Sequence, residues 1–145
     1  MRALIQRVRW AAVEVQGQEV GRIGPGMLVF LGVERDDDEA RADALAARLL
    51  AYRVFADAGG RMNLDVRAAG GGVLLVSQFT LAADTTRGLR PGFSTAAAPQ
   101  TANALYERVL GALRARHAPV ACGTFGASMQ VSLCNDGPVT FLLQN

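Results

Sequence analysis

Residues 27–33 read Met-Leu-Val-Phe-Leu-Gly-Val, a continuous apolar run of strand length, and residues 73–76 read Val-Leu-Leu-Val. Such a run without polar alternation is typical of a strand that is buried on both faces. Strand signals also dominate residues 4–15 and 19–23, ahead of the first run. We therefore expect these segments to form the centre of a sheet.

Helical spacing appears twice in the chain. Four acidic residues at 36–39 precede Ala42, Leu45 and Leu49, which recur at the interval of one helix face. We interpret the acids as favourable charges at a helix N-terminus, with a calcium or magnesium site as the alternative. A second helix is predicted from Pro99 to about Arg116, because proline suits a first helical turn.

Further strands are predicted near residues 120–122, 129–133 and 139–143. The chain then runs strands, helix, strands, helix, strands, with too few helices for regular βαβ repetition. This order favours an α/β chain of mixed α+β character, in which two main helices cover a mixed sheet. No repeat or linker divides the sequence, so we expect residues 1–145 to form a single domain.

The composition excludes several kinds of chemistry. Half of the 145 residues are apolar and 19% are charged, so the chain can bury a core. All 15 basic residues are arginine, which excludes a lysine Schiff base, and the net charge is only +2. With one histidine and two separated cysteines we expect no metal and no cofactor, and a Ser-His-Asp catalyst would require His117.

The hydropathy pattern bears on location. The first ten residues are too charged for a secretory signal, and no apolar stretch reaches the ~20 residues that span a bilayer. We therefore expect a cytoplasmic protein without membrane contact, in which Cys122 and Cys134 are reduced thiols.

The second apolar run continues without a break into Ser77-Gln78-Phe79-Thr80, where Ser77, Gln78 and Thr80 are polar. With strand alternation, Ser77 and Phe79 would face one side of the sheet, and Gln78 and Thr80 the other. Ligands of open α/β sheets bind at the carboxyl ends of strands, so this segment is a candidate site. The alternative is a plain strand end whose hydroxyl groups satisfy neighbouring backbone groups.

A second unusual segment is Asp136-Gly137-Pro138-Val139-Thr140. Glycine allows unusual backbone angles, and a bond that precedes proline adopts the cis form at low cost. We expect a turn between two strands here, with a cis Gly137–Pro138 bond, although the pattern alone indicates no more than a tight turn.

Residues 77–81 (Ser-Gln-Phe-Thr-Leu) and 135–140 (Asn-Asp-Gly-Pro-Val-Thr) resemble the two signature motifs of the D-aminoacyl-tRNA deacylases. The resemblance covers the whole chain in order, including residues 24–26, 61–63, 88–91 and 125–127. Two motifs at the family's spacing are highly specific. The departures lie outside both motifs: the family usually has serine at Gly92, an acid at Ser128 and often lysine at Arg61.

The resemblance implies a homodimer with active sites at the subunit interface. In each subunit, curved mixed β-sheets would form a barrel-like sandwich that two main helices cover. It implies a hydrolase that cleaves the ester bond of D-aminoacyl-tRNA and of glycine mischarged on tRNA-Ala. This reaction is a chiral proofreading step in translation. The partner is then aminoacyl-tRNA, and no DNA is expected. The family's Gly-Pro peptide is cis and enters the partner subunit's pocket, where it rejects L-amino acids. The terminal ribose 2′-hydroxyl assists its catalysis.

The resemblance also assigns roles to particular residues. Ser77, Gln78, Phe79 and Thr80 act through backbone and positioning, because an unactivated threonine hydroxyl is a weak nucleophile. The Phe79 and Thr80 N–H groups are candidate oxyanion donors. Expected substrate-binding residues are Gly137, Pro138, Phe125, Met129 and Arg7. Phe125 would stack on the terminal adenine, or else be a core residue, and Arg7 would brace the Gly-Pro loop.

Arg87 and Arg90 are candidate contacts to tRNA phosphates, because they flank a glycine close in sequence to the first motif. Two other functions stay open. One is a non-catalytic homodimer that binds nucleic acid on the same scaffold, and the other is a small amino-acid-binding module.

Overall fold

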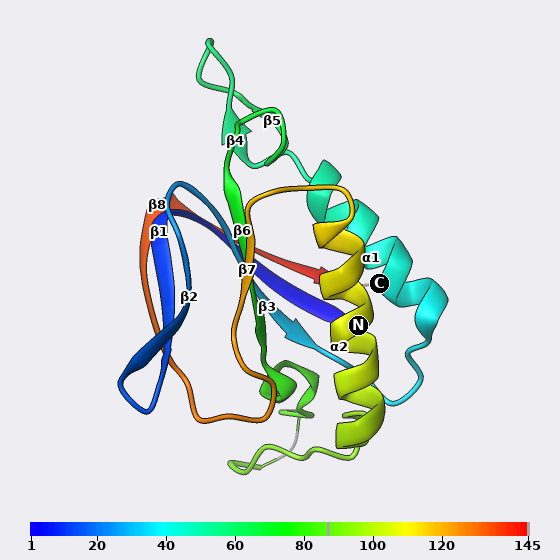
Figure 1. The fold of residues 1–145 in the computed structure, drawn as a ribbon. Helices are drawn as coiled ribbons and strands as arrows, with labels where there is room; N and C mark the ends of the chain where they lie inside the picture. Colours follow the sequence, from blue (N-terminus) through cyan, green and yellow to red (C-terminus); the bar gives the residue numbers. More distant parts are fainter. Residues whose placement is uncertain (87, 145) are drawn as a thin grey trace.

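The computed structural model describes residues 1–86 and 88–144. Its elements, drawn in Figure 1, are β1 (Arg2–Val15), β2 (Gln18–Ile23), β3 (Gly26–Gly32), α1 (Glu39–Ala51), β4 (Phe55–Ala56), β5 (Met62–Leu64), β6 (Gly72–Ser77), the 3₁₀ helix η1 (Phe79–Ala82), α2 (Pro99–Arg114), β7 (Val120–Cys122) and β8 (Gln130–Gln144). No helix in these ranges is long and apolar enough to cross a membrane.

The main sheet is mixed, as expected. Its strand order is β2-β1-β3-β6-β7, and β8 pairs with β1 along the other edge. The pairs β3–β6 and β6–β7 are parallel, whereas β1 is antiparallel to β2, β3 and β8. The sheet curves until β2 approaches β7, where a Cβ at Gly21 would lie 2.6 Å from the Cys122 carbonyl oxygen. Glycine at that position therefore allows the barrel-like sheet to come close to closure.

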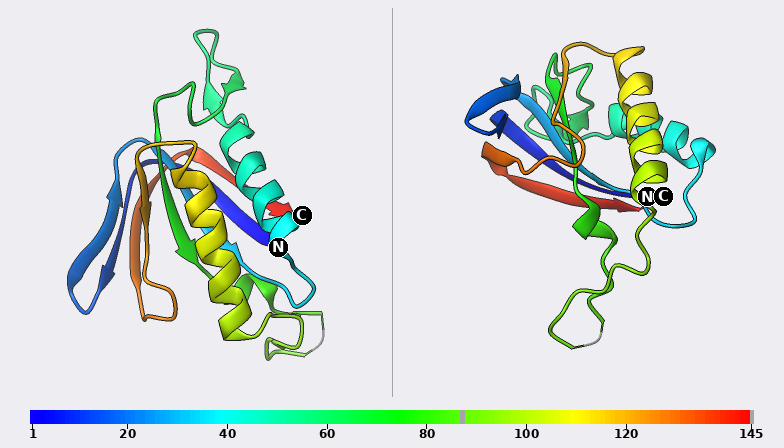
Figure 2. Two further views of the ribbon diagram at one scale, coloured as in Figure 1. Left: turned by 45° about the vertical axis from the view of Figure 1, so that its right-hand side comes forward. Right: turned by 60° about the horizontal axis from the view of Figure 1, so that its bottom comes forward.

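Side chains from the central strands enter two cores. Met27, Val29 and Leu75 belong to the core beneath the helices, while Leu28 and Leu74 belong to a second core inside the curved sheet. Because alternate residues of β3 and β6 enter different cores, both strands are buried on both faces, which confirms the prediction from their apolar runs. Figure 2 shows α1 and α2 together on one face of the sheet.

The acidic residues at 36–39 mark the start of α1. The Asp38 carboxylate caps the helix by accepting a hydrogen bond from the Arg41 N–H at 2.8 Å. Asp37 is buried and accepts one from the Met1 α-amino group at 2.5 Å. These contacts confirm the interpretation of the acids as a helix N-terminus. Pro99 stands in the first turn of α2, also as predicted.

The expected strand alternation over residues 77–80 is wrong. β6 ends at Ser77 and the chain turns into η1, with hydrogen bonds from Leu81 N–H to the Gln78 carbonyl and from Ala83 N–H to the Thr80 carbonyl. The neighbouring strand β3 also ends here, at Gly32, so the ladder offers residues 79–82 no further partner. The 3₁₀ turn satisfies their backbone groups instead.

The expected pair of C-terminal strands is a single strand, β8. Gln6 pairs with Thr140 and Val8 pairs with Asn135, so residues 136–139 bulge outward opposite Arg7 and no reversal of direction occurs. A bulge adds unpaired residues to one strand while the pairing resumes on either side. The Gly137–Pro138 bond within the bulge is cis, as predicted.

Candidate active site

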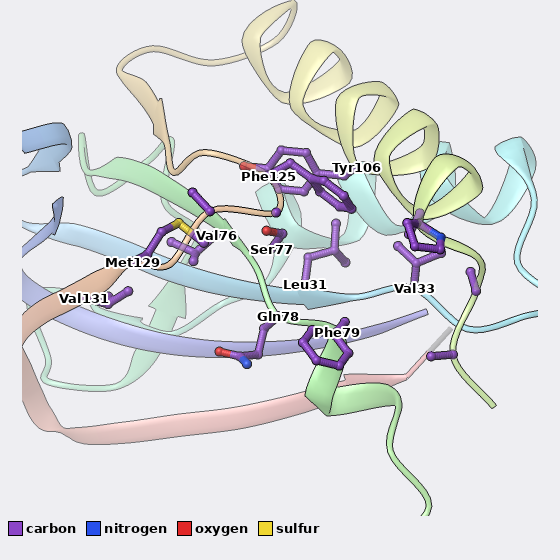
Figure 3. Close-up of a pocket in the computed structure, with 16 residues that line it drawn as sticks. Leu31, Val33, Val76, Ser77, Gln78, Phe79, Tyr106, Phe125, Met129 and Val131 are labelled. Carbon is purple, nitrogen blue, oxygen red and sulfur yellow. The ribbon is translucent and has the colours of Figure 1, made fainter. Parts of the chain in front are cut away.

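A cavity of about 450 Å³ opens where β3 and β6 end. Figure 3 shows its walls, which are lined by Leu31, Val33, Val76, Ser77, Gln78, Phe79, Ala96, Ala97, Pro99, Ala102, Tyr106, Phe125, Gly126, Ala127, Met129 and Val131. Most of these side chains are apolar, and the polar ones come mainly from the first motif at the strand end. Such a combination is typical of a small-molecule site.

The backbone of the first motif is held from three other segments. Gln78 N–H donates to the Leu31 carbonyl at 2.8 Å, which extends the β3–β6 ladder by one bond. The Arg2 guanidinium donates to the Leu81 carbonyl at 3.2 Å, and the Thr95 hydroxyl donates to the Ala82 carbonyl. The turn is therefore fixed at the cavity mouth by groups from β1, β3 and the segment that leads into α2.

The motif's side chains occupy different positions. Ser77 is half-buried and lines the cavity, as do Gln78 and Phe79. Thr80 is exposed and is not among the lining residues, and its hydroxyl accepts a hydrogen bond from the Gln78 amide. Phe79 is 60% exposed, and its ring packs against that of Phe93, with ring centroids 5.1 Å apart.

Two aromatic rings form the wall under α2. Tyr106 and Phe125 have their centroids 5.7 Å apart, and Figure 3 shows them on one side of the β6 end while Gln78 lies on the other. Phe125 packs against the main core, as the core alternative expects, and it also lines the cavity. Met129, from the segment before β8, lines the same cavity and packs against the second core.

The described cavity wall holds one ionisable side chain, that of Tyr106. Its hydroxyl donates to the Leu75 carbonyl at 3.0 Å, and burial raises the pKa of Tyr106 far above its ordinary value of 10.0. The phenol is therefore neutral at physiological pH. His117 contacts the Gly71 carbonyl at 2.8 Å, next to the opposite end of β6, so it cannot act as a base in this cavity.

The second motif lies away from this cavity in the same chain. Arg7 donates from Nε to the Asp136 carbonyl at 2.9 Å and from Nη1 to the Val54 carbonyl at 2.8 Å. Arg7 is paired with Met27 of β3, four residues from Leu31 at the cavity, which corresponds to ~13 Å along a strand. Gly137 and Pro138 are exposed and are absent from the lining.

Of the two candidate phosphate contacts, Arg90 is exposed on the loop between η1 and α2, and Arg87 lies outside the described residues. Both cysteines are free thiols, as expected.

Sequence reasoning missed several residues of the site. Tyr106 follows Ala102 by four positions and precedes Val109 by three, a helical interval that would have placed it on the buried face of α2. Asn135 stood in the second motif without an assigned role, although asparagine often hydrogen-bonds to nearby backbone. Nothing in the sequence indicates that Arg2 reaches Leu81, because 79 positions separate them.

Three comparisons relate the chain to known proteins. The D-Tyr-tRNA(Tyr) deacylase family matches residues 4–144. A D-aminoacyl-tRNA deacylase of Stutzerimonas stutzeri is 61% identical over all of both chains, and one of Cellvibrio japonicus is 60% identical over 99% of each.

Two solved structures share the fold. One, titled c-Myc DNA Unwinding Element Binding Protein, has a TM-score of 0.95 and 36% identity over 100% of this chain and 99% of that one. Another, titled a probable eukaryotic D-amino acid tRNA deacylase, has a TM-score of 0.85 over 98% and 97% of the two chains. At 18% identity that likeness concerns the fold alone.

Proposed function

The chain belongs to the D-Tyr-tRNA(Tyr) deacylase family, and from this we propose that it hydrolyses the ester between a D-amino acid and the 3′-terminal ribose of tRNA. Glycine mischarged on tRNA-Ala is a second substrate of the same reaction. The products are free amino acid and tRNA, so the enzyme removes wrongly charged tRNA before translation uses it. We place this reaction in the cytoplasm.

The observation that carries the proposal is the fixed polar turn at the mouth of an apolar cavity. A volume of about 450 Å³ falls within the range of small-ligand sites, and the Phe125 and Met129 side chains offer apolar surface to the terminal adenine. The ester would then lie at the mouth, near residues 77–80. The substrate enters as a single-stranded RNA end. Proteins that recognise RNA bases mostly bind single-stranded loops, bulges and ends, where the bases are accessible.

Water attacks the ester carbonyl carbon, the carbonyl oxygen becomes an oxyanion, and the ribose 3′-oxygen leaves with a proton. The first N–H groups of a helical turn lack an intrahelical acceptor, so those of Phe79 and Thr80 suit the oxyanion. No side chain of the described cavity wall is a base at neutral pH. The ribose 2′-hydroxyl, both donor and acceptor, therefore orients the water.

We infer further that the site is completed by a second copy of the chain. Gly137 and Pro138 are exposed and far from their own cavity, which suits a segment that enters the cavity of a partner subunit. There the rigid backbone would hold the amino group of a D-aminoacyl ester and clash with an L side chain. Glycine, without a side chain, passes this filter. Arg90, exposed on the loop that follows η1, would contact tRNA phosphates.

Incubation with D- and L-aminoacyl-tRNA carrying the same amino acid tests the activity. We expect free amino acid to be released from the D ester much faster than from the L ester, and the spontaneous hydrolysis of each ester provides the baseline. Equal release of amino acid from both esters, at the spontaneous rate, would refute the proposed activity.

Binding of nucleic acid without catalysis is the second candidate, and the name of the solved structure with 36% identity, a DNA unwinding element binding protein, favours it. The same incubation separates the two functions, because a binding protein retains aminoacyl-tRNA without cleaving it. A DNA-binding protein would in addition retain duplex DNA in competition with tRNA.

A further inference from the structure

The outward bulge that carries Gly137 and Pro138 is closed at its base by one side chain. The Asn135 Oδ1 atom accepts a hydrogen bond from Val139 N–H at 2.7 Å. The Nδ2 atom of the same amide donates to the Val139 carbonyl at 3.3 Å and to the Thr140 hydroxyl at 3.1 Å. Both backbone polar groups of Val139 therefore meet a single side chain.

These contacts take the place of strand pairing. β1 pairs with β8 at Val8–Asn135 and again at Gln6–Thr140, and the residues between the two pairs have no ladder partners in β1. A primary amide carries the same donor and acceptor as a peptide group, so it can satisfy one residue as a neighbouring strand would. Gln6 adds a hydrogen bond to the Thr140 hydroxyl at 3.1 Å, which ties the base of the bulge to β1.

The other side of the bulge is held by charge. Arg7 donates to the Asp136 carbonyl, and the Asp136 carboxylate lies 3.6 Å from Arg7 and 3.5 Å from Arg9. Asp136 and Val139, which flank the exposed Gly137 and Pro138, are thus both held by hydrogen bonds, and these restrain the backbone between them. Rejection of a substrate by steric clash requires such rigidity, because a segment that yields removes the clash.

We propose that Asn135 is a positioning residue for chiral selection: its amide sets the placement of Gly137 and Pro138, and thereby the discrimination between D and L esters. The proposal rests on the function proposed above. It assigns to Asn135 no contact with substrate. Its effect is on selectivity, through the backbone that Asn135 holds.

The isosteric substitution Asn135→Asp is the sharpest probe. A carboxylate keeps the acceptor for Val139 N–H, loses both Nδ2 donations and places an oxygen against the Val139 carbonyl. Asn135→Ala removes all three hydrogen bonds. The matched control is Asn63→Ala, which removes an exposed asparagine whose amide donates to Asp57 at 2.7 Å in the β4–β5 hairpin.

The experiment measures kcat/KM for D- and L-aminoacyl-tRNA in full-length dimers of each variant, with circular dichroism to establish folding. We expect the D-to-L ratio to fall at least tenfold in Asn135→Asp and in Asn135→Ala, mainly because L-ester hydrolysis rises. Asn63→Ala should keep the wild-type ratio. An unchanged ratio in folded Asn135→Asp overturns the proposal, and so does a loss of folding in both Asn135 variants, which would make the residue structural.

A Gly137→Ala variant distinguishes failure of this proposal from failure of the filter itself. The φ of Gly137 is +149°, and a Cβ there would lie 2.7 Å from Val139 Cγ2 and 3.2 Å from Arg7 Nη2. We expect that variant to lose most D-ester turnover. If it does while the Asn135 variants keep their ratio, only the role of Asn135 is wrong. If Gly137→Ala is fully active and selective, the filter itself is wrong.

Discussion

The Thr80 hydroxyl is the obvious nucleophile in the first motif, yet its surroundings argue against that role. It is exposed, it accepts a hydrogen bond from Gln78, and it does not line the cavity. A serine or threonine nucleophile needs an adjacent base to take its proton, and the described wall offers none. In the proposed mechanism, Thr80 contributes its backbone N–H and not its hydroxyl group.

We therefore expect Thr80→Ala to retain deacylation within about tenfold of wild type, whereas loss of a true nucleophile costs ~10⁴-fold or more. Single-turnover rates on D-aminoacyl-tRNA measure the difference. Thr86→Ala is the control, because it removes another exposed threonine hydroxyl, one that donates to Asp84 at 2.7 Å. A Thr80→Ala rate near the spontaneous rate would establish side-chain catalysis.

At the scale of elements, the position of η1 depends on Arg2 at the start of β1. The half-buried guanidinium donates to the Glu34 carboxylate at 2.9 Å and to the Leu81 carbonyl at 3.2 Å. Arg2 therefore links η1 to β1 and to the segment that follows β3. Without Arg2, the Leu81 carbonyl loses a charged donor, a bond worth about 1.5–3 kcal/mol in a buried setting and less where water reaches.

The expected result of Arg2→Ala is a fall in kcat of about tenfold with a smaller change in KM, since the turn loosens while the cavity persists. Arg2→Lys should recover part of the rate, because one ammonium cannot reach both partners with the geometry of a guanidinium. Steady-state kinetics on a D-aminoacyl-tRNA series give both constants. Arg48→Ala, which removes an exposed donor to the Gln144 carbonyl, should leave them unchanged; an equal loss there would contradict the role of Arg2.

How elements end was harder to predict than which elements exist. The apolar runs at residues 27–33 and 73–76 carry enough side chains to define two buried strands, and the structure has both. Where β6 stops is decided by the end of β3, a partner 46 positions earlier along the chain. Likewise Asn135 and Thr140 remain in one strand because β1 pairs on both sides of the bulge, which no local pattern contains.

At the scale of the whole molecule, the sequence revealed the two motifs but not the distance between them in the folded chain. Residues 77–79 line the cavity, whereas Gly137 lies in the β8 bulge opposite Arg7 of β1, about four strand positions away. How far apart the two motifs lie depends on the register in which the strands pair, and the sequence does not determine that register here. This separation leads to the strongest prediction, because a site built from two chains can be divided between them.

Subunit mixing tests that division. Ala127 lines the cavity, so Ala127→Trp should fill it, while Gly137→Ala should distort the bulge and leave the cavity of its own chain open. Each variant alone is then expected to be nearly inactive as a homodimer. In a mixed dimer, the open cavity of the Gly137→Ala subunit receives the intact bulge of the Ala127→Trp subunit, and one of the two sites works.

Equal amounts of the two variants, unfolded together and refolded, should thus recover about a quarter of the wild-type rate, since half of the dimers are mixed and each has one site. Differently tagged subunits allow the mixed dimer to be purified, and its D-aminoacyl-tRNA hydrolysis should be about half that of wild type. A wild-type dimer refolded in the same way corrects for losses. If the mixed dimer is as inactive as its parents, the cavity and the bulge must act within one chain. The ~13 Å that separates them along the strands argues against that arrangement.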